Sequence, residues 1–252
     1  MTIFGTNIGR SNAYGFVLKI NHDTLLKRCC SMLKVMSVET DCELPEETFL
    51  ALSALVSPEK RKRINRLLHR QNAINMLMGD IIVRHMICAH TGLRNETLLF
   101  LTNQYEKPYL ANVSDVHFNI SHSGNIVVCA LSDETVGIDI EMIKPAMLQI
   151  AKRFFSAGEY EFIEAKADKS LAFYKIWTMK ESYVKWEGKG LSTPLKSFNV
   201  LELERQGRPF FHSIDISAGT YCYVCSDIER INSYKHNRLS DLLKSDYFSS
   251  LG

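Results

Sequence analysis

Two segments of the chain alternate apolar and polar residues, a pattern typical of a half-buried β-strand. Residues 116–121 and residues 136–141 both carry an apolar side chain at every second position. Successive side chains of a strand point to opposite faces of the sheet, so each segment is expected to bury one face. Apolar runs bounded by turn residues predict further strands at residues 13–20, 98–101, 125–131, 198–203, 209–214 and 221–225.

Helical patterns lie between these strands. Ser57 and Pro58 suit the N-cap and first position of a helix, and helical periodicity continues to about His90, before an expected stop at Thr91 and Gly92. Its apolar face is formed by Ile74, Leu77, Met78, Ile81 and Ile82. A short helix from residue 156 or 157 to 165 and a long one at 169–186 follow. Helices mixed with hairpin-like strands predict an α+β fold rather than a doubly wound parallel sheet.

Composition narrows the class of protein. The chain has 252 residues, of which 46% are hydrophobic and 23% charged, as in an ordinary globular protein. The net charge of +2 is too small to indicate nucleic-acid binding. The first ten residues lack the pattern of a secretory signal, and no apolar run approaches the roughly 20 residues of a membrane helix. Seven scattered cysteines favour reduced thiols and a cytoplasmic location, and the pair at 222 and 225 reads as buried strand thiols.

Asp139 and Glu141 form the first chemical motif. On a strand they share one face, while Ile138 and Ile140 face the core. Adjacent carboxylates repel each other unless a cation or proton intervenes, and Mg²⁺ prefers such oxygen ligands together with phosphate oxygens. The alternative is a solvent-facing edge strand with two acids.

The helix at 169–186 carries a second motif. Thr178, Glu181 and Lys185 share one stripe of this helix. Glu181 and Lys185 are either an exposed ion pair or a metal carboxylate beside a phosphate-binding cation. Residues 188–190, Gly-Lys-Gly, either end the helix or form part of a phosphate loop.

Two weaker signals complete the set. His122, at a strand end, is either a turn residue or a ligand contact. The sequence has no second histidine at zinc-like spacing and no cysteine cluster beside it, which argues against a zinc site. Ser121 and Ser123 lack the Gly-x-Ser-x-Gly elbow of serine hydrolases. Residues 60–70 contain six basic residues, which are either a solvated helix or a phosphate-binding patch.

In this order and spacing, the motifs resemble those of a known family. Residues 118–124, 137–141, 154–156 with 159–160, 177–185 and 188–192 look like the 4′-phosphopantetheinyl transferases, in particular the long, surfactin-synthetase-activating class. Residues 57–61 and 79–80 extend the similarity, which covers about residues 45–230.

The resemblance implies two similar α+β halves related by a pseudo-twofold axis, at residues 1–134 and 135–252, with coenzyme A in the cleft between them. It implies a Mg²⁺-dependent transfer of the 4′-phosphopantetheine arm of coenzyme A to a carrier-protein serine, with release of adenosine 3′,5′-bisphosphate, by a cytoplasmic monomer. The implied metal ligands are Asp139, Glu141 and Glu181. The implied coenzyme A contacts are Arg70, Lys107, Ser121, His122 and Lys185, and the implied catalytic residues are Glu159, as general base, and Lys185.

Two positions depart from the family pattern. Glu106 stands where the family has glycine, and Asn75 stands where it has arginine, so the nucleotide contacts of both positions are in question. Two other functions compete with the implied one: a Mg²⁺-dependent enzyme that acts on another nucleotide diphosphate, and a non-catalytic protein that binds coenzyme A or a carrier.

Overall fold

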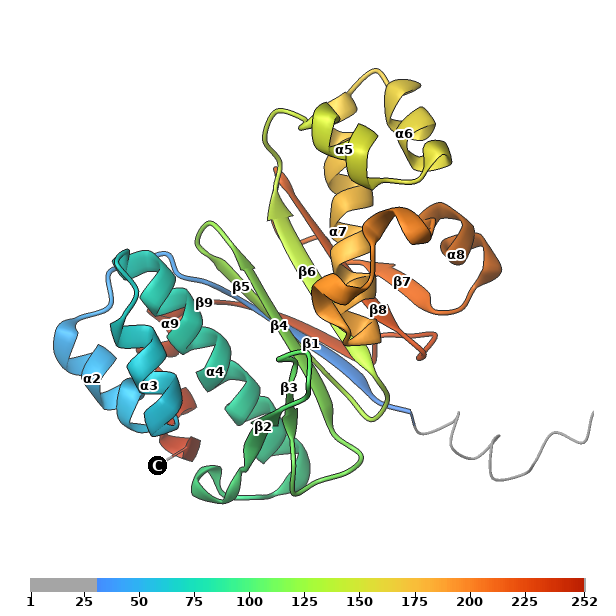
Figure 1. The fold of residues 1–252 in the computed structure, drawn as a ribbon. Helices are drawn as coiled ribbons and strands as arrows, with labels where there is room; N and C mark the ends of the chain where they lie inside the picture. The colour runs from blue at the N-terminus through green and yellow to red at the C-terminus, as the bar shows by residue number, and fades with distance from the viewer. Residues whose placement is uncertain (1–30, 252) are drawn as a thin grey trace, which may run out of the picture. The chain divides into compact units, whose positions relative to one another are not determined.

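Strands from both ends of the described chain meet in one sheet, here called the first sheet (Figure 1). The structure is a computed structural model that describes residues 31–251. The strands of the first sheet, in spatial order, are β4 (His117–Ser123), β5 (Ile126–Ser132), β1 (Leu33–Glu39) and β9 (Ser233–Arg238). The first three are antiparallel neighbours, whereas β9 runs parallel to β1.

The hairpin between β4 and β5 turns at Gly124 and Asn125. Gly124 has a φ of +60°, the left-handed region that favours glycine, and a Cβ atom there would overlap the sulfur of Met142. The turn lies between the strands predicted at residues 116–121 and 125–131, and it takes in Asn125, the first residue of the second predicted strand.

Helices cover one face of the first sheet. They are α2 (Glu46–Ala54), α3 (Pro58–Asn65) and α4 (Arg70–Thr91), and α4 packs directly on β4 and β5. The predicted apolar face of α4 is confirmed, because all five of its residues are buried. The predicted caps are also confirmed: Ser57 Oγ accepts a hydrogen bond from the backbone of Lys60, and Gly92 ends α4 in the left-handed conformation.

The prediction of one continuous helix from residue 57 to 90 is wrong. The chain leaves the helical path between α3 and α4, and Leu68 in this turn is 96% exposed. His69, the residue before α4, is extended, with a φ of −97° and a ψ of 122°, so a new helix begins at Arg70.

A second sheet carries the other long helix. Its strands, in spatial order, are β6 (Val136–Met142), β8 (Thr220–Ser226) and β7 (Phe210–Ser213), all antiparallel neighbours. Helix α7 (Lys169–Glu187) packs on β6 and β8. Around it lie α5 (Leu148–Phe154), α6 (Ala157–Glu164) and α8 (Val200–Gln206).

The prediction of a strand at residues 198–203 is wrong, because α8 begins there. The Asn199 side chain accepts hydrogen bonds from the backbones of Leu201 and Glu202, and Gly207 ends the helix in the left-handed conformation. These two caps outweigh the β-propensity of a short apolar run. The other predicted strands from residue 116 onward match β4 to β8, apart from shifts at their ends.

Several short elements complete the described chain. They are the two-stranded sheet of β2 (Phe100–Thr102) and β3 (Pro108–Leu110), helix α9 (Leu239–Leu242), and the 3₁₀ helices η1 (Asn95–Thr97), η2 (Gly190–Ser192), η3 (Leu195–Ser197) and η4 (Asp246–Leu251). Strands β1 and β9 and helix α5 were not predicted. The predicted strand at residues 13–20 lies outside the described residues.

Each sheet thus carries one long helix. This mixture of helices and largely antiparallel sheets confirms the predicted α+β fold with two similar halves. Strands β4 and β6 lie side by side at the junction of the sheets. The boundary between residues 134 and 135 stays a prediction, since β9 and α9 follow the second sheet in the chain but pack with the first. None of the helices in residues 31–251 is long and apolar enough to cross a bilayer.

Candidate active site

Strand β6 presents Asp139 and Glu141 on one face. Ile138 and Ile140, on the other face, are buried in an apolar cluster with residues of β1, β5 and β8. The predicted alternation is therefore confirmed. Both carboxylates face the junction with β4, where Asn119 Oδ1 accepts a hydrogen bond of 2.9 Å from the backbone N–H of Ile138.

Gly137 allows α7 to approach these carboxylates. A Cβ atom at this position would overlap the backbone oxygen of Ser182 and the backbone nitrogen of Trp186. Helix α7 therefore lies directly against β6, which places Glu181 and Lys185 beside the acids of the strand. The glycine of this motif is required by packing.

Asp139 is the centre of the resulting polar cluster. Its Oδ1 atom accepts hydrogen bonds from Lys185 Nζ at 2.6 Å and from Ser121 Oγ at 2.8 Å, and Lys185 also donates to Ser121 at 2.9 Å. The other oxygen, Oδ2, is buried and has no hydrogen-bond partner in the described chain. An unpartnered buried carboxylate oxygen is costly unless a cation or donor reaches it.

The pKa values of the neighbouring carboxyls reflect their crowding. Burial, followed by the charge of Asp139, raises the pKa of Glu141 and of Glu181, and the Lys185 ammonium partly offsets this rise. Crowded carboxyls whose pKa is raised by a neighbouring acid favour an added cation. No group of three or more His, Cys, Asp or Glu side chains in residues 31–251 is already arranged to hold a metal, and Lys185 supplies the positive charge.

Two donors that the sequence analysis missed hold Glu141. Trp177 Nε1, on α7, donates to Glu141 Oε1 at 3.2 Å, and Ser123 Oγ, on β4, donates to Oε2 at 3.2 Å. Ser123 follows Asn119 and Ser121 at every second position of β4, so the alternation of polar residues was the signal that could have identified it.

His122 and Lys107 lie near the cluster in different ways. His122 is exposed, and its pKa is lowered by partial desolvation and then by the charge of Lys185. Lys107 Nζ donates instead to the backbone oxygens of Lys185, Val136 and Trp186, at 2.6, 3.1 and 3.4 Å. Burial lowers the pKa of Lys107 to about 8. The ammonium of Lys107 therefore joins the end of α7 to the start of β6.

A cavity of about 320 Å³ lies next to these residues. Its lining, mostly apolar, includes Tyr105, Pro108 and Val184, with Glu181 and Lys185 on one side. Glu106, at the rim, has a φ of +66°, which is strained for a residue other than glycine. The cavity is a site where a flat or apolar group can lie beside the carboxylates.

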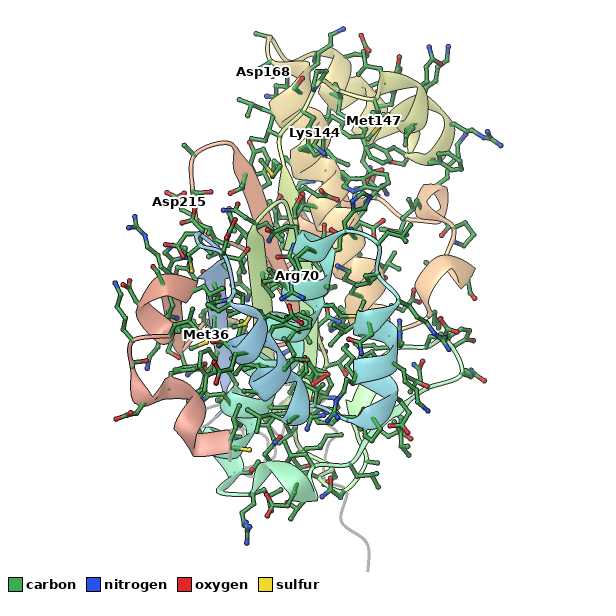
Figure 2. The ribbon with its side chains drawn as sticks, turned by 90° about the vertical axis from the view of Figure 1, so that its left-hand side faces the viewer. Met36, Arg70, Lys144, Met147, Asp168 and Asp215 are labelled. Carbon is green, nitrogen blue, oxygen red and sulfur yellow. The ribbon has the colours of Figure 1, made fainter. Side chains whose placement is uncertain are left out.

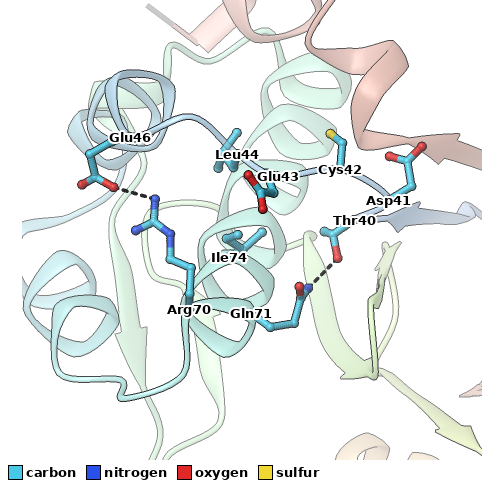
Figure 3. A pocket seen from close by; sticks show the side chains of 9 residues that line it. All are labelled: Thr40, Asp41, Cys42, Glu43, Leu44, Glu46, Arg70, Gln71 and Ile74. Atoms are coloured by element: carbon cyan, nitrogen blue, oxygen red, sulfur yellow. Dashed lines mark hydrogen bonds and ion pairs between the residues drawn. The ribbon is translucent and has the colours of Figure 1, made fainter.

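Arg70 is not brought to the carboxylate cluster. Its guanidinium forms an ion pair of 2.8 Å with Glu46 and lies over the ring of Phe49. Figure 2 shows Arg70 on α4, whereas Lys144 and Met147 lie beyond the end of β6. Arg70 borders a separate cavity of about 460 Å³ whose lining also contains Asp41, Glu43 and Glu46 (Figure 3).

Asn75 belongs to a neutral hydrogen-bond network beside this second cavity. Its Nδ2 donates to the backbone oxygen of Gly124 at 2.8 Å, and its Oδ1 accepts from Gln71 at 2.9 Å. Gln71 also donates to Thr40, as the dashed line in Figure 3 shows. The amide of Asn75 is thus committed to joining α4 to the β4–β5 turn.

Glu159 is fully buried in the core around α7. Four donors reach its two oxygens: the backbone N–H and hydroxyl of Ser156, the backbone N–H of Val200, and the ammonium of Lys180 at 2.8 Å. The Lys180 side chain is fully buried as well. This arrangement is a helix capping box completed by an internal ion pair. The predicted role of general base remains untested.

Comparisons with known proteins agree on one family. A family model described as the 4′-phosphopantetheinyl transferase superfamily matches residues 135–237, and one described as 4′-phosphopantetheinyl transferase, N-terminal, matches residues 44–134. The chain is 44% identical to 4′-phosphopantetheinyl transferase Sfp of Bacillus subtilis over 194 residues, which cover 76% of this chain and 85% of the relative. It is 39% identical to 4′-phosphopantetheinyl transferase gsp of Aneurinibacillus migulanus, over 82% of this chain and 92% of the relative.

Proposed function

Because the chain belongs to the 4′-phosphopantetheinyl transferase family, we propose that it transfers the 4′-phosphopantetheine arm of coenzyme A to a serine of an acyl or peptidyl carrier protein. The transferred group leaves adenosine 3′,5′-bisphosphate as the second product. The carboxylate cluster at the β4–β6 junction carries this proposal, because it combines the buried, unpartnered Oδ2 of Asp139 with a neighbouring lysine.

The donor set of this cluster fits Mg²⁺. Asp139, Glu141 and Glu181 offer only hard oxygen atoms, and the buried Oδ2 of Asp139 has no hydrogen-bond partner in the described chain. When bound, Mg²⁺ would supply positive charge against the pyrophosphate of coenzyme A. Lys185 donates to Asp139 Oδ1, and we propose that Lys185 contacts the phosphates when coenzyme A is bound. Ser121, which donates to Asp139, and the exposed His122 next to it on β4 are both proposed to contact coenzyme A.

The proposed reaction is a phosphoryl-type transfer. The serine oxygen of the carrier attacks the β-phosphorus of coenzyme A, the bond from this phosphorus to the bridging oxygen breaks, and the adenosine bisphosphate leaves with the electron pair. The serine proton passes to a base. Such a transfer depends mainly on positioning and on charge neutralisation, which the cluster is built to provide.

Glu159 is the predicted base. The closed set of donors around Glu159 supports a structural role, since a proton could be accepted only by releasing one of them. Arg70 and Lys107 are likewise proposed as coenzyme A contacts. Their present partners mean that each would have to exchange an internal contact for a phosphate.

The intact mass of an apo carrier protein tests the function. After incubation with enzyme, coenzyme A and Mg²⁺, the carrier should gain the mass of one phosphopantetheine arm. Dephospho-coenzyme A and ATP, supplied separately, test whether another nucleotide diphosphate is the substrate. An unchanged carrier mass under all conditions, with coenzyme A bound, would favour the non-catalytic binder.

Asp139→Ala is the matched variant for the metal site, and it should nearly abolish transfer while the fold persists. Wild-type turnover in this variant would contradict the assignment. Sedimentation tests the predicted monomer, and a cytoplasmic location stays a prediction.

A further inference from the structure

Glu141 differs from the other two carboxylates of the cluster in how it is held. In the described chain, Glu141 receives one hydrogen bond on each oxygen, whereas Asp139 receives both of its bonds on a single oxygen and the carboxylate of Glu181 receives none. The two donors, Ser123 and Trp177, come from β4 and α7. Glu141 is therefore fixed from two directions.

The chemistry of the two donors suits an ionised carboxylate. The Ser123 hydroxyl also accepts a hydrogen bond of 3.0 Å from the backbone N–H of Met142. Because that N–H can only donate, the hydroxyl proton of Ser123 is left for the carboxylate of Glu141. The indole N–H of Trp177 is a donor without an acceptor function. The Trp177 contact therefore cannot reverse, and an ionised Glu141, which can only accept, satisfies both donors.

The packing around each donor fixes its position. Ser123 is the last residue of β4, one residue before the Gly124 turn on which Met142 packs. The Trp177 ring stacks on Phe173 and lies against Phe155. The donors are thus supported by the backbone of β6 and by the apolar core, so Glu141 need not lose side-chain freedom when a cation binds.

We infer that Ser123 and Trp177 are positioning residues that fix Glu141 for the cation and pyrophosphate of coenzyme A, with Ser123 linking this carboxylate to the first sheet. The inference rests on the proposed function. Donors behind a metal ligand typically contribute 10- to 100-fold in metal affinity or activity. Loss of either donor should therefore weaken cation binding more than it changes the affinity for coenzyme A.

Calorimetric titration of Mg²⁺ into the complex of the full chain with coenzyme A, without carrier, tests this inference. Ser123→Ala should raise the Kd for Mg²⁺ about tenfold, and Ser123→Thr, which keeps a hydroxyl, should restore most of the affinity. Trp177→Phe keeps an aromatic ring in the stack but removes the donor, and should raise the Kd similarly. Ser217→Ala, an exposed serine between β7 and β8, is the matched control and should bind as the wild type does.

The outcomes separate the inference from the proposed function. A wild-type chain that transfers the arm and binds Mg²⁺, together with a folded Ser123→Ala variant of unchanged Kd, would overturn the role of Ser123. If Ser123→Ala fails to fold, Trp177→Phe decides, and an unchanged Kd in that variant overturns the inference. A wild-type chain that binds no Mg²⁺ beside coenzyme A overturns the proposed metal site, and the inference with it.

Discussion

The ion pair between Glu159 and Lys180 allows a structural role to be separated from a catalytic one. Both side chains are 0% exposed. Lys180 donates to the backbone oxygens of Leu195 and Phe198 as well, at 2.7 and 2.9 Å, so the pair joins α6 and α7 to the segment that leads into α8. Glu159→Gln removes one charge from this pair and keeps the side-chain shape.

The expected loss of stability in Glu159→Gln follows from the hydrogen-bond partners of Glu159. All four groups that reach Glu159 are donors, and the amide nitrogen of glutamine is a donor as well, so at least one donor would face another. Lys180 would keep its charge without a buried counter-ion. Breaking a buried pair in this way costs about 3–5 kcal/mol. At roughly 2–4 °C per kcal/mol for a chain of this size, Tm should fall by about 10 °C.

Thermal denaturation followed by circular dichroism measures this loss. Glu164→Gln is the matched control on the same helix, because the Glu164–Lys169 pair is solvent-exposed and such pairs contribute little to stability. The Lys180→Met, Glu159→Gln double variant should cost less than the sum of the two single variants, as coupled residues require.

Turnover of the folded variant, measured well below its melting temperature, completes the test. If Glu159 is structural, the folded fraction of Glu159→Gln should retain turnover within about tenfold of the wild type. If turnover falls at least a hundredfold, with Tm and coenzyme A affinity unchanged, Glu159 is the general base and the structural reasoning is refuted.

Three further predictions concern residues around the carboxylate cluster of Asp139, Glu141 and Glu181. Gly137→Ala should lower Tm and activity together, with a cost of about 3 kcal/mol or more, because its methyl group would push α7 away from β6; a wild-type melting curve would show that the packing is looser than described. Glu106→Gly should raise stability by about 0.5–1 kcal/mol in urea denaturation by relieving the positive φ, and a loss of stability would mean that the carboxylate has a stabilising partner when the chain is in solution. Burial lowers the pKa of Lys107 from 10.5 to about 8. Between these two pH values the unfolded chain binds a proton at Lys107 that the folded chain has released. The contribution of Lys107 to the free energy of unfolding should therefore increase as the pH rises through this range. The Tm values of the wild type and of Lys107→Met, measured at about pH 7.5 and 9.5, check the sign. A Tm of the wild type that falls relative to that of the variant as the pH rises would contradict it.

The elements that local pattern specifies were predictable from the sequence. The shared face of Asp139 and Glu141 follows from the alternation within β6, and the start of α3 follows from Ser57 and Pro58. These features depend on residues within one or two turns of each other. The proximity of Glu181 and Lys185 to the strand acids came only from family resemblance, because no local pattern specifies how a helix docks on a strand.

The elements that depend on distant partners were not predictable. Strand β9 is largely polar and forms the edge of its sheet, so it has no apolar alternation, and only its pairing with β1 defines it as a strand. Residues 198–203 were read by β-propensity, but the caps of α8 decide their conformation. The hydrogen-bond partners of Glu159 could not be predicted, because Lys180, on another helix, and Val200 come within reach of it only in the folded chain.

The pairing of β1 with β9 has a consequence for how the chain acquires its structure during synthesis. The Asn232 side chain accepts a hydrogen bond from the backbone of Leu33, 199 residues away, and Leu239, Leu242 and Leu251 belong to the apolar core beneath the first sheet. The first sheet is therefore complete only after β9, near the end of the described chain, has paired with β1. Contacts of such sequence separation slow folding. A nascent chain on the ribosome should hold β1 with an open edge until residues 232–251 have emerged, and β1 should be protected from proteolysis only after that point.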